Sequence, residues 1–206
     1  INPDVRFIFV LGLDAQTPQE SANFVRFLLD DKDASAWGAL RASYGLEEPV
    51  NLMGFELGNE NYFSAEPGEN VAEEEYDSYI QNAVDWYTET ARSHIDAVRE
   101  VYPEVQFYAN VNGRSSRVSA SAWNTGVAEK LGAYINAVAL HYYYNSALRV
   151  SDCFDEMDNI QTIFQNTTGK KTKFVITEHA IWDTGNAVRR VSLEACLADA
   201  AFFNTA

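Results

Sequence analysis

The stretch Leu52-Met53-Gly54-Phe55-Glu56-Leu57-Gly58-Asn59-Glu60 combines a largely apolar run of strand length with a polar ending, in which a glutamate follows Gly-Asn. A second apolar run, at residues 174–177, is followed directly by Glu178. Short apolar runs are typical of buried strands, and a side chain at the end of such a strand is held rigidly at the mouth of a site. The sequence therefore predicts that Glu60 and Glu178 each close a buried strand.

The same alternation of apolar runs and helical patterns continues along the chain. The predicted strands are residues 5–11, 52–57, 105–111, 135–141 and 174–178. Thr17-Pro18-Gln19-Glu20 is a capping box that starts the first predicted helix. Further helices are predicted at about residues 73–101, 120–131, 152–165 and 192–203. Strands alternating with helices predict a mostly parallel sheet covered by helices.

The two strand-end glutamates can meet only if this sheet curves. Glu60 follows the second predicted strand and Glu178 the fifth, so in a flat sheet in chain order these strands would lie roughly 14 Å apart. In a barrel, inward-pointing carboxylates could converge. The predicted fold class is therefore α/β, a (β/α)8 TIM barrel.

A complete barrel of this kind needs roughly 250 residues, whereas the chain has 206. We therefore expect an incomplete barrel of about five β/α units, with about two units before Ile1 and a final strand after Ala206 missing. One partial catalytic domain is expected over residues 1–206, approximately from strand 3 to helix 7 of the barrel.

The composition argues against several classes of function. Thirty acidic residues against fifteen basic ones give a formal net charge of -15, which repels nucleic-acid phosphates and anionic membranes. No apolar stretch is long enough for a membrane span. The three histidines and two cysteines show no metal-ligand spacing. They are His94, His141, His179, Cys153 and Cys196. The sequence therefore predicts no metal or cofactor and no nucleic-acid or membrane partner, and leaves neutral sugars open.

A pair of carboxylates is the machinery of glycoside hydrolysis. In retaining enzymes the two groups lie about 5–5.5 Å apart, one acting as general acid/base and the other as nucleophile. A lone strand-end glutamate more often forms a salt bridge, but two in specific motifs favour catalysis by Glu60 and Glu178. Two alternatives stay open: a non-catalytic or degenerate barrel that binds glycans, and a plain structural domain.

An ordered set of motifs also resembles the family 51 alpha-L-arabinofuranosidases. The set is Trp37-Gly38-Ala39-Leu40-Arg41-Ala42, Glu48-Pro49-Val50, Phe55-Glu56-Leu57-Gly58-Asn59-Glu60, Val98-Arg99-Glu100-Val101-Tyr102-Pro103, Leu140-His141-Tyr142-Tyr143-Tyr144, Thr177-Glu178-His179-Ala180-Ile181-Trp182 and Ser192-Leu193-Glu194-Ala195. That family belongs to clan A of retaining (β/α)8 hydrolases, whose acid/base and nucleophile end strands four and seven. The resemblance implies that Glu60 is the acid/base and Glu178 the nucleophile.

The implied activity is cleavage of plant-type polysaccharides or oligosaccharides by double displacement, and a secreted or periplasmic location is favoured over a cytoplasmic one. The family commonly has Asp-Glu-Trp-Asn around the nucleophile, whereas this chain has Thr177-Glu178-His179-Ala180. Neighbouring side chains choose the sugar, so other clan A activities (xylosidase, glucuronidase, endoglucanase) stay open.

The resemblance also implies four substrate-binding residues. Asn59 matches an asparagine that bonds the sugar 2-hydroxyl, with a turn-capping role as the alternative. Tyr143 matches a tyrosine that orients the nucleophile. His141 is either a sugar contact or a core histidine. Trp182 matches an aromatic wall of the sugar site, because an indole face stacks well on sugar C–H groups; core packing is the alternative there.

Overall fold

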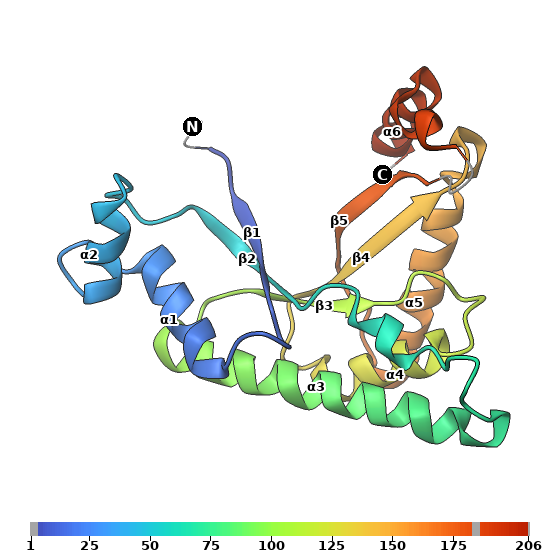
Figure 1. The fold of residues 1–206 in the computed structure, drawn as a ribbon, viewed down its shortest axis with the longest axis horizontal. Coiled ribbons are helices and arrows are strands. Elements are labelled where there is room, and N and C mark those ends of the chain that lie inside the picture. The colour runs from blue at the N-terminus through green and yellow to red at the C-terminus, as the bar shows by residue number, and fades with distance from the viewer. Residues whose placement is uncertain (1–3, 183–185, 206) are drawn as a thin grey trace.

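The computed structural model describes residues 4–182 and 186–205. Its five strands lie in one sheet in chain order, and every neighbouring pair is parallel. They are β1 (Phe7–Leu11), β2 (Leu52–Leu57), β3 (Phe107–Val111), β4 (Ala137–Tyr144) and β5 (Phe174–Ile181). Figure 1 shows them as a trough, with β1 and β2 on one side, β3 at the bottom, and β4 and β5 on the other. The predicted incomplete (β/α) barrel is confirmed.

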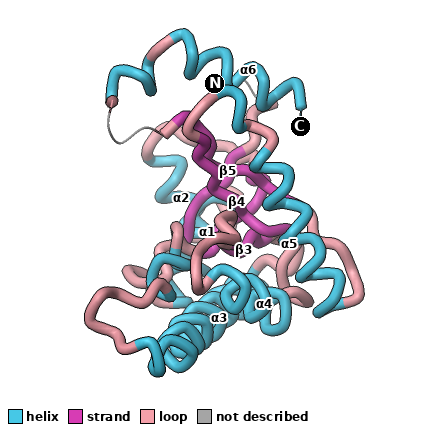
Figure 2. Tube along the Cα trace, turned by 90° about the vertical axis from the view of Figure 1, so that its right-hand side faces the viewer, coloured by secondary structure: helices cyan, strands magenta, loops and turns pink. Residues whose placement is uncertain are grey.

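The helices lie outside this trough. They are α1 (Pro18–Leu29), α2 (Ala36–Ser43), α3 (Tyr76–Val101), α4 (Ala120–Leu131), α5 (Asp152–Thr168) and α6 (Leu193–Thr205), with short 3₁₀ turns η1 (Asn61–Ala65), η2 (Glu73–Glu75), η3 (Ala147–Arg149) and η4 (Ala187–Val191). Figure 2 shows α3 and α4 together on one side of the strands. None of the described helices is both long and apolar enough to cross a membrane.

The capping box predicted at the start of α1 is present. The Thr17 hydroxyl accepts a hydrogen bond from the Glu20 backbone amide at 3.2 Å, and the Glu20 carboxylate accepts one from the Thr17 amide at 2.7 Å. Helix α2 was not predicted, because it has only 8 residues. Its amino end is capped by the Ser35 hydroxyl, which accepts from Trp37 and Gly38.

The predicted ends of the last two strands were wrong. Strand β4 continues past His141 to Tyr144, and β5 continues past Glu178 to Ile181. The two extensions pair with each other, and the register shifts between Leu140 and His141. Glu178 therefore lies within β5 rather than at its end, because pairing with the aromatic extension of β4 carries the strand further.

The side chains of the strands divide into two layers. The larger apolar cluster fills the space between sheet and helices and includes Phe55, Phe107 and Trp123. A smaller cluster of Tyr108, Ala137 and Ala139 lies apart from it. Because side chains alternate along a strand, this small cluster belongs to the inner face of the trough. The polar residues of the site continue along the same face.

Candidate active site

The turn after β2 places Glu60. Gly58 has φ +76°, and a Cβ there would lie 1.8 Å from the Asn61 side-chain oxygen. Glu60 has φ 52°, the only positive φ at a non-glycine residue in the part of the chain that the structure describes. Such a conformation costs about 1–3 kcal/mol and occurs preferentially at functional sites. The Gly-Asn-Glu motif is therefore a sharp turn that leads from the strand into η1.

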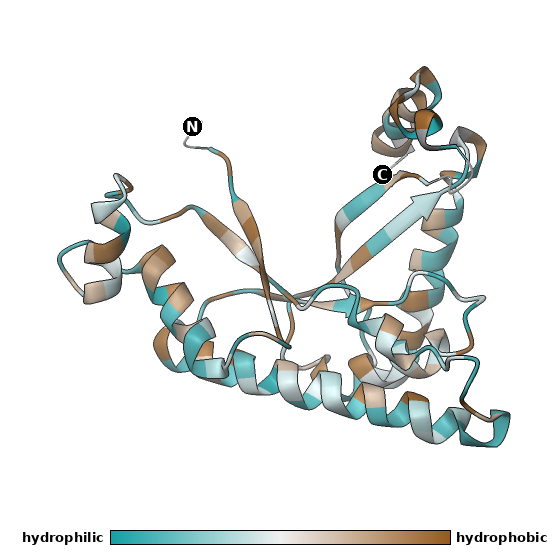
Figure 3. Ribbon diagram, in the orientation of Figure 1, coloured by the Kyte–Doolittle hydropathy of each residue, from teal (hydrophilic) through white to brown (hydrophobic). Residues whose placement is uncertain are grey.

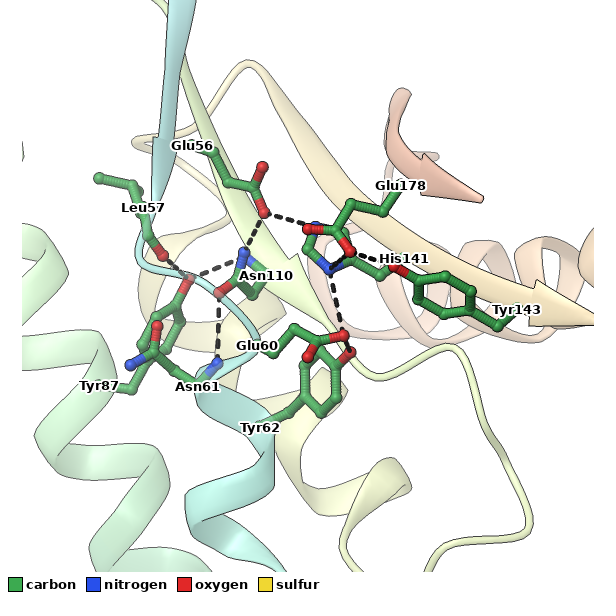
Figure 4. Close-up of polar contacts among 10 residues, drawn as sticks. All are labelled: Glu56, Leu57, Glu60, Asn61, Tyr62, Tyr87, Asn110, His141, Tyr143 and Glu178. Carbon is green, nitrogen blue, oxygen red and sulfur yellow. Dashed lines mark hydrogen bonds and ion pairs between the residues drawn. The ribbon is translucent and has the colours of Figure 1, made fainter. Parts of the chain in front are cut away.

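Three donors surround the two predicted catalytic carboxylates (Figure 4). The Tyr62 hydroxyl donates to Glu60 Oε1 at 2.9 Å, and the Tyr143 hydroxyl donates to Glu178 Oε2. His141 Nδ1 lies 3.2 Å from Glu60 Oε1 and 3.5 Å from Glu178 Oε2. One oxygen of each carboxylate and a His141 ring nitrogen all lie within 4.8 Å of one another. The fold thus brings together two glutamates that are far apart in the sequence.

A buried carboxylate lies on the opposite side of the His141 ring from this pair. Glu56 is 2% exposed, and its Oε1 lies 3.0 Å from His141 Nε2. This contact has ion-pair distance but not the alignment of a hydrogen bond. Asn110 Nδ2 donates to the same Glu56 oxygen at 2.7 Å, and Asn110 Oδ1 accepts from the Asn61 amide at 3.4 Å. The network ties the inner face of the sheet to the turn that carries Glu60.

Three residues of this network were not among the predicted site residues: Glu56, Asn110 and Tyr62. The signal for the first two was a charged or amide side chain inside an otherwise apolar strand, because burying such a group is costly unless it is paired. Tyr62 carried no such signal, since its hydroxyl reaches Glu60 only through the left-handed turn.

The electrostatics favour the donor forms of these side chains. Burial acts to lower the pKa of His141, but the carboxylates of Glu56, Glu178 and Glu60 outweigh it, so the pKa is raised. Burial and the hydrogen bond to Glu178 raise the pKa of Tyr143, and burial and Glu60 do the same for Tyr62. Both hydroxyls therefore stay protonated and available as donors.

The spacing of Glu60, His141 and Glu178 would also suit three ligands of a metal ion. A histidine that binds a metal must offer a lone pair. Here Nδ1 of His141 lies at hydrogen-bonding distance from Glu60 Oε1, and the two carboxylates accept hydrogen bonds from Tyr62 and Tyr143. The donor set thus fits a hydrogen-bonded carboxylate pair better than a metal centre.

A cavity of about 410 Å³ opens beside Glu60. It is lined by Glu60, Tyr62, Phe63, Arg114, Arg117, His141, Tyr143 and Trp182. Trp182 is 46% exposed and packs edge-on against Tyr143, with ring centroids 5.4 Å apart. The cavity has the size of a site for a small ligand.

Five of the six predicted site residues meet here, and Asn59 does not join them. Asn59 is exposed in the turn between Gly58 and Glu60 and does not line the cavity. It makes no hydrogen bond with another residue of 4–182 or 186–205. Its role in sugar binding stays a prediction.

An incomplete parallel barrel with two facing carboxylates toward the carboxyl ends of its strands has the architecture of the (β/α)8 glycosidases. Residues 12–162 match the family model described as the alpha-L-arabinofuranosidase 1 domain. This match covers more than half of the chain, so the chain belongs to that family.

Named relatives agree with this membership. The chain is 26% identical over 184 residues to Alpha-L-arabinofuranosidase 1 of Arabidopsis thaliana, which covers 89% of this chain and 21% of the relative. It is 24% identical over 172 residues to Probable alpha-L-arabinofuranosidase A of Aspergillus terreus, covering 82% and 21%. The chain thus spans about a fifth of the length of these relatives.

Solved structures share the fold. A family 51 alpha-L-arabinofuranosidase from Bifidobacterium longum superposes with a TM-score of 0.64 at 12% identity, covering 85% of this chain and 36% of that one. The GH51 arabinofuranosidase from Xanthomonas axonopodis pv. citri has a TM-score of 0.64 at 15% identity, covering 96% and 42%. At these identities the likeness concerns the fold alone.

Proposed function

We propose that the chain is part of the catalytic domain of a retaining glycoside hydrolase, similar in activity to the alpha-L-arabinofuranosidases. The observation that carries the proposal is the separation of the carboxylates: one oxygen of Glu60 and one of Glu178 lie within 4.8 Å. Retaining enzymes hold their carboxyl groups about 5–5.5 Å apart, whereas inverting enzymes leave about 6.5–9.5 Å for a water molecule.

In the proposed reaction, Glu60 gives its proton to the leaving-group oxygen while Glu178 attacks the anomeric carbon. The glycosidic bond breaks and a glycosyl ester with Glu178 forms. Glu60, now a carboxylate, takes a proton from water, which attacks the same carbon and releases Glu178. The Tyr143 hydroxyl orients the nucleophile through its hydrogen bond, and His141 lies against both carboxylates.

The names of the relatives support oligosaccharides or polysaccharides with arabinofuranosyl groups as substrates. The proposal further places the chain at approximately strand 3 to helix 7 of a (β/α)8 barrel, with Glu60 ending strand four and Glu178 on strand seven. Polymeric plant-type substrates lie outside cells, which supports a secreted or periplasmic site of action.

The test is the Glu178→Ala variant of the full-length protein with an aryl arabinofuranoside. Turnover is expected to be lost, and added azide should restore it partly, giving a glycosyl azide, because azide can occupy the space of the missing carboxylate. Glu60→Ala is the companion variant, and it should slow substrates with poor leaving groups far more than activated aryl glycosides. Undiminished hydrolysis by Glu178→Ala would end the assignment.

A further inference from the structure

Two arginines line the cavity beside Glu60, although the chain carries a net charge of -15. Arg114 and Arg117 both belong to the loop between β3 and α4. This loop follows the carboxyl end of a barrel strand, where substrate contacts of such folds are made. Because the molecule as a whole is acidic, we expect the reason for these two positive charges to lie in the site itself.

Arg117 is held in a defined position. Its Cζ lies 4.7 Å from the centre of the Phe63 ring, and its Nη1 lies 3.7 Å from Glu66 Oε2. Glu66 in turn accepts hydrogen bonds from the Ser119 hydroxyl and, at 3.5 Å, from Asn112 Nδ2. The contact to Arg117 is too long for a hydrogen bond, so the guanidinium keeps donors for another acceptor.

Arg114 has no acidic partner among the described residues. Its side chain is exposed, and no carboxylate of residues 4–182 or 186–205 lies at ion-pair distance from it. The loop around it is nevertheless anchored: its amide donates to Asn112 Oδ1 at 3.1 Å, and the Ser115 hydroxyl donates to Glu156 at 2.8 Å. The nearby carboxylate of Glu156 is thus engaged by Ser115, which leaves the guanidinium facing the cavity unpaired.

We propose that Arg114 and Arg117 form a subsite for a sugar carboxylate on the leaving-group side of the cleavage point, so that the substrate is an acidic oligosaccharide. The inference rests on the proposed function, in which Glu60 meets the leaving-group oxygen. Arg117 lies against Phe63 and Glu66, in the segment that directly follows Glu60, so the subsite lies on the leaving-group side. A planar carboxylate matches the donor fork of a guanidinium.

The experiment compares two oligosaccharides that differ in a single group. One carries a uronic acid in its leaving group as the free carboxylate, and the other carries the same residue as its neutral methyl ester. Binding is measured by calorimetry to the full-length Glu178→Ala protein, so that turnover is not needed. The free acid is expected to bind roughly tenfold more tightly, the size of one charge-assisted hydrogen bond.

The variants Arg114→Gln and Arg117→Gln, each added to Glu178→Ala, should bring this ratio close to one. Arg92→Gln is the matched control, because Arg92 lies on α3 and pairs with Asp96 at 2.8 Å; it should leave the ratio unchanged. Added salt should shrink the preference, since the pairing is exposed. Both oligosaccharides are measured on the same preparation of each variant. A fraction of unfolded protein then affects both measurements equally and leaves the ratio of the two affinities unchanged.

The subsite would be overturned if the acid and the ester bound equally well. It would also be overturned if the preference for the acid survived both arginine substitutions. In either case the arginines would only balance the charge of the nearby carboxylates. The proposed function fails by a different result. If the unsubstituted protein hydrolyses no neutral aryl arabinofuranoside, the catalytic assignment is wrong, whatever the binding ratio.

Discussion

The most demanding residue in the site is Glu56, a carboxylate buried on the inner face of β2. It is 2% exposed, and His141, at 5% exposure, lies at ion-pair distance from it. A buried charge is tolerated when it is paired and hydrogen-bonded, and Asn110 supplies the hydrogen bond. The Glu56 carboxylate therefore helps to raise the pKa of His141, and the protonated ring can donate from Nδ1 toward the catalytic carboxylates.

We expect Glu56→Gln to lower the pKa of His141 in the full-length protein, because it removes the charge that lies nearest to Nε2. Since the folded-state pKa of His141 is raised, the pair stabilises fully below the unfolded value of about 6.5 and loses this effect as the pH rises through the folded value. Glu56→Gln should therefore cost roughly 2 kcal/mol at slightly acidic pH and less at alkaline pH.

The measurement is an NMR titration of labelled histidine, with unfolding followed at several pH values. The control is Glu89→Gln, at an exposed position of α3, which should change neither quantity. An unshifted His141 titration in Glu56→Gln would show that the other carboxylates alone hold the proton.

At the level of elements, the decisive piece is the turn from β2 to η1. Gly58 and Glu60 both have positive φ values, and the turn is pinned at Asn61 by Asn110. Tyr87 fixes the strands behind it, since its hydroxyl donates to Leu57 O at 3.0 Å and accepts from the Asn110 amide at 2.8 Å. The position of Glu60 thus depends on a backbone shape that side chains from β3 and α3 hold in place.

Gly58→Ala is expected to reduce activity of the full-length protein more than tenfold and stability by about 2 kcal/mol, because a Cβ adds a collision to an unfavourable φ. The collision is with the Asn61 side chain, 1.8 Å away. Gly169→Ala is the matched control: Gly169 has φ +74° at the end of α5 but open space around it. It should cost about 1 kcal/mol and leave activity intact. The measurements are kcat/KM and unfolding midpoints, and equal effects of the two substitutions would contradict the argument.

On the scale of the whole molecule, the trough has two open sides. Within the described residues, β1 and β5 each pair with a strand on one edge only. Helix α6 adds apolar surface near β5: Leu193, Leu197 and Phe203 are exposed, and Figure 3 shows α6 as largely hydrophobic. Unpaired edges and contiguous apolar surface favour association.

The 206-residue chain on its own is therefore expected to self-associate in a concentration-dependent way, which sedimentation would detect. Leu193→Glu with Leu197→Glu should weaken this association, because charges oppose burial of the helix face. Val118→Glu is the control, as Val118, on the loop before α4, is as exposed as Leu197. A chain that stays monomeric at high concentration would refute the expectation.

Patterns among residues that are close in the sequence were enough to predict much of the architecture. The capping box at Thr17 and the apolar periodicity of α3 predicted those helices, because hydrogen bonding and helical spacing depend on nearby residues. The β/α alternation predicted parallel strands, and two apolar runs ending in glutamate predicted the residues of the site. Alternation and length also predicted that the barrel is incomplete.

The sequence by itself determined the order of the strands, the helices other than α2, and the two carboxylates. Only the tertiary structure decided that Glu60 and Glu178 face each other across His141, that Glu56 lies behind them, and that Asn59 does not line the cavity. Those outcomes depend on the curvature of the sheet and on the register shift at β4. Both arise from the packing of distant segments, which no short stretch of sequence encodes.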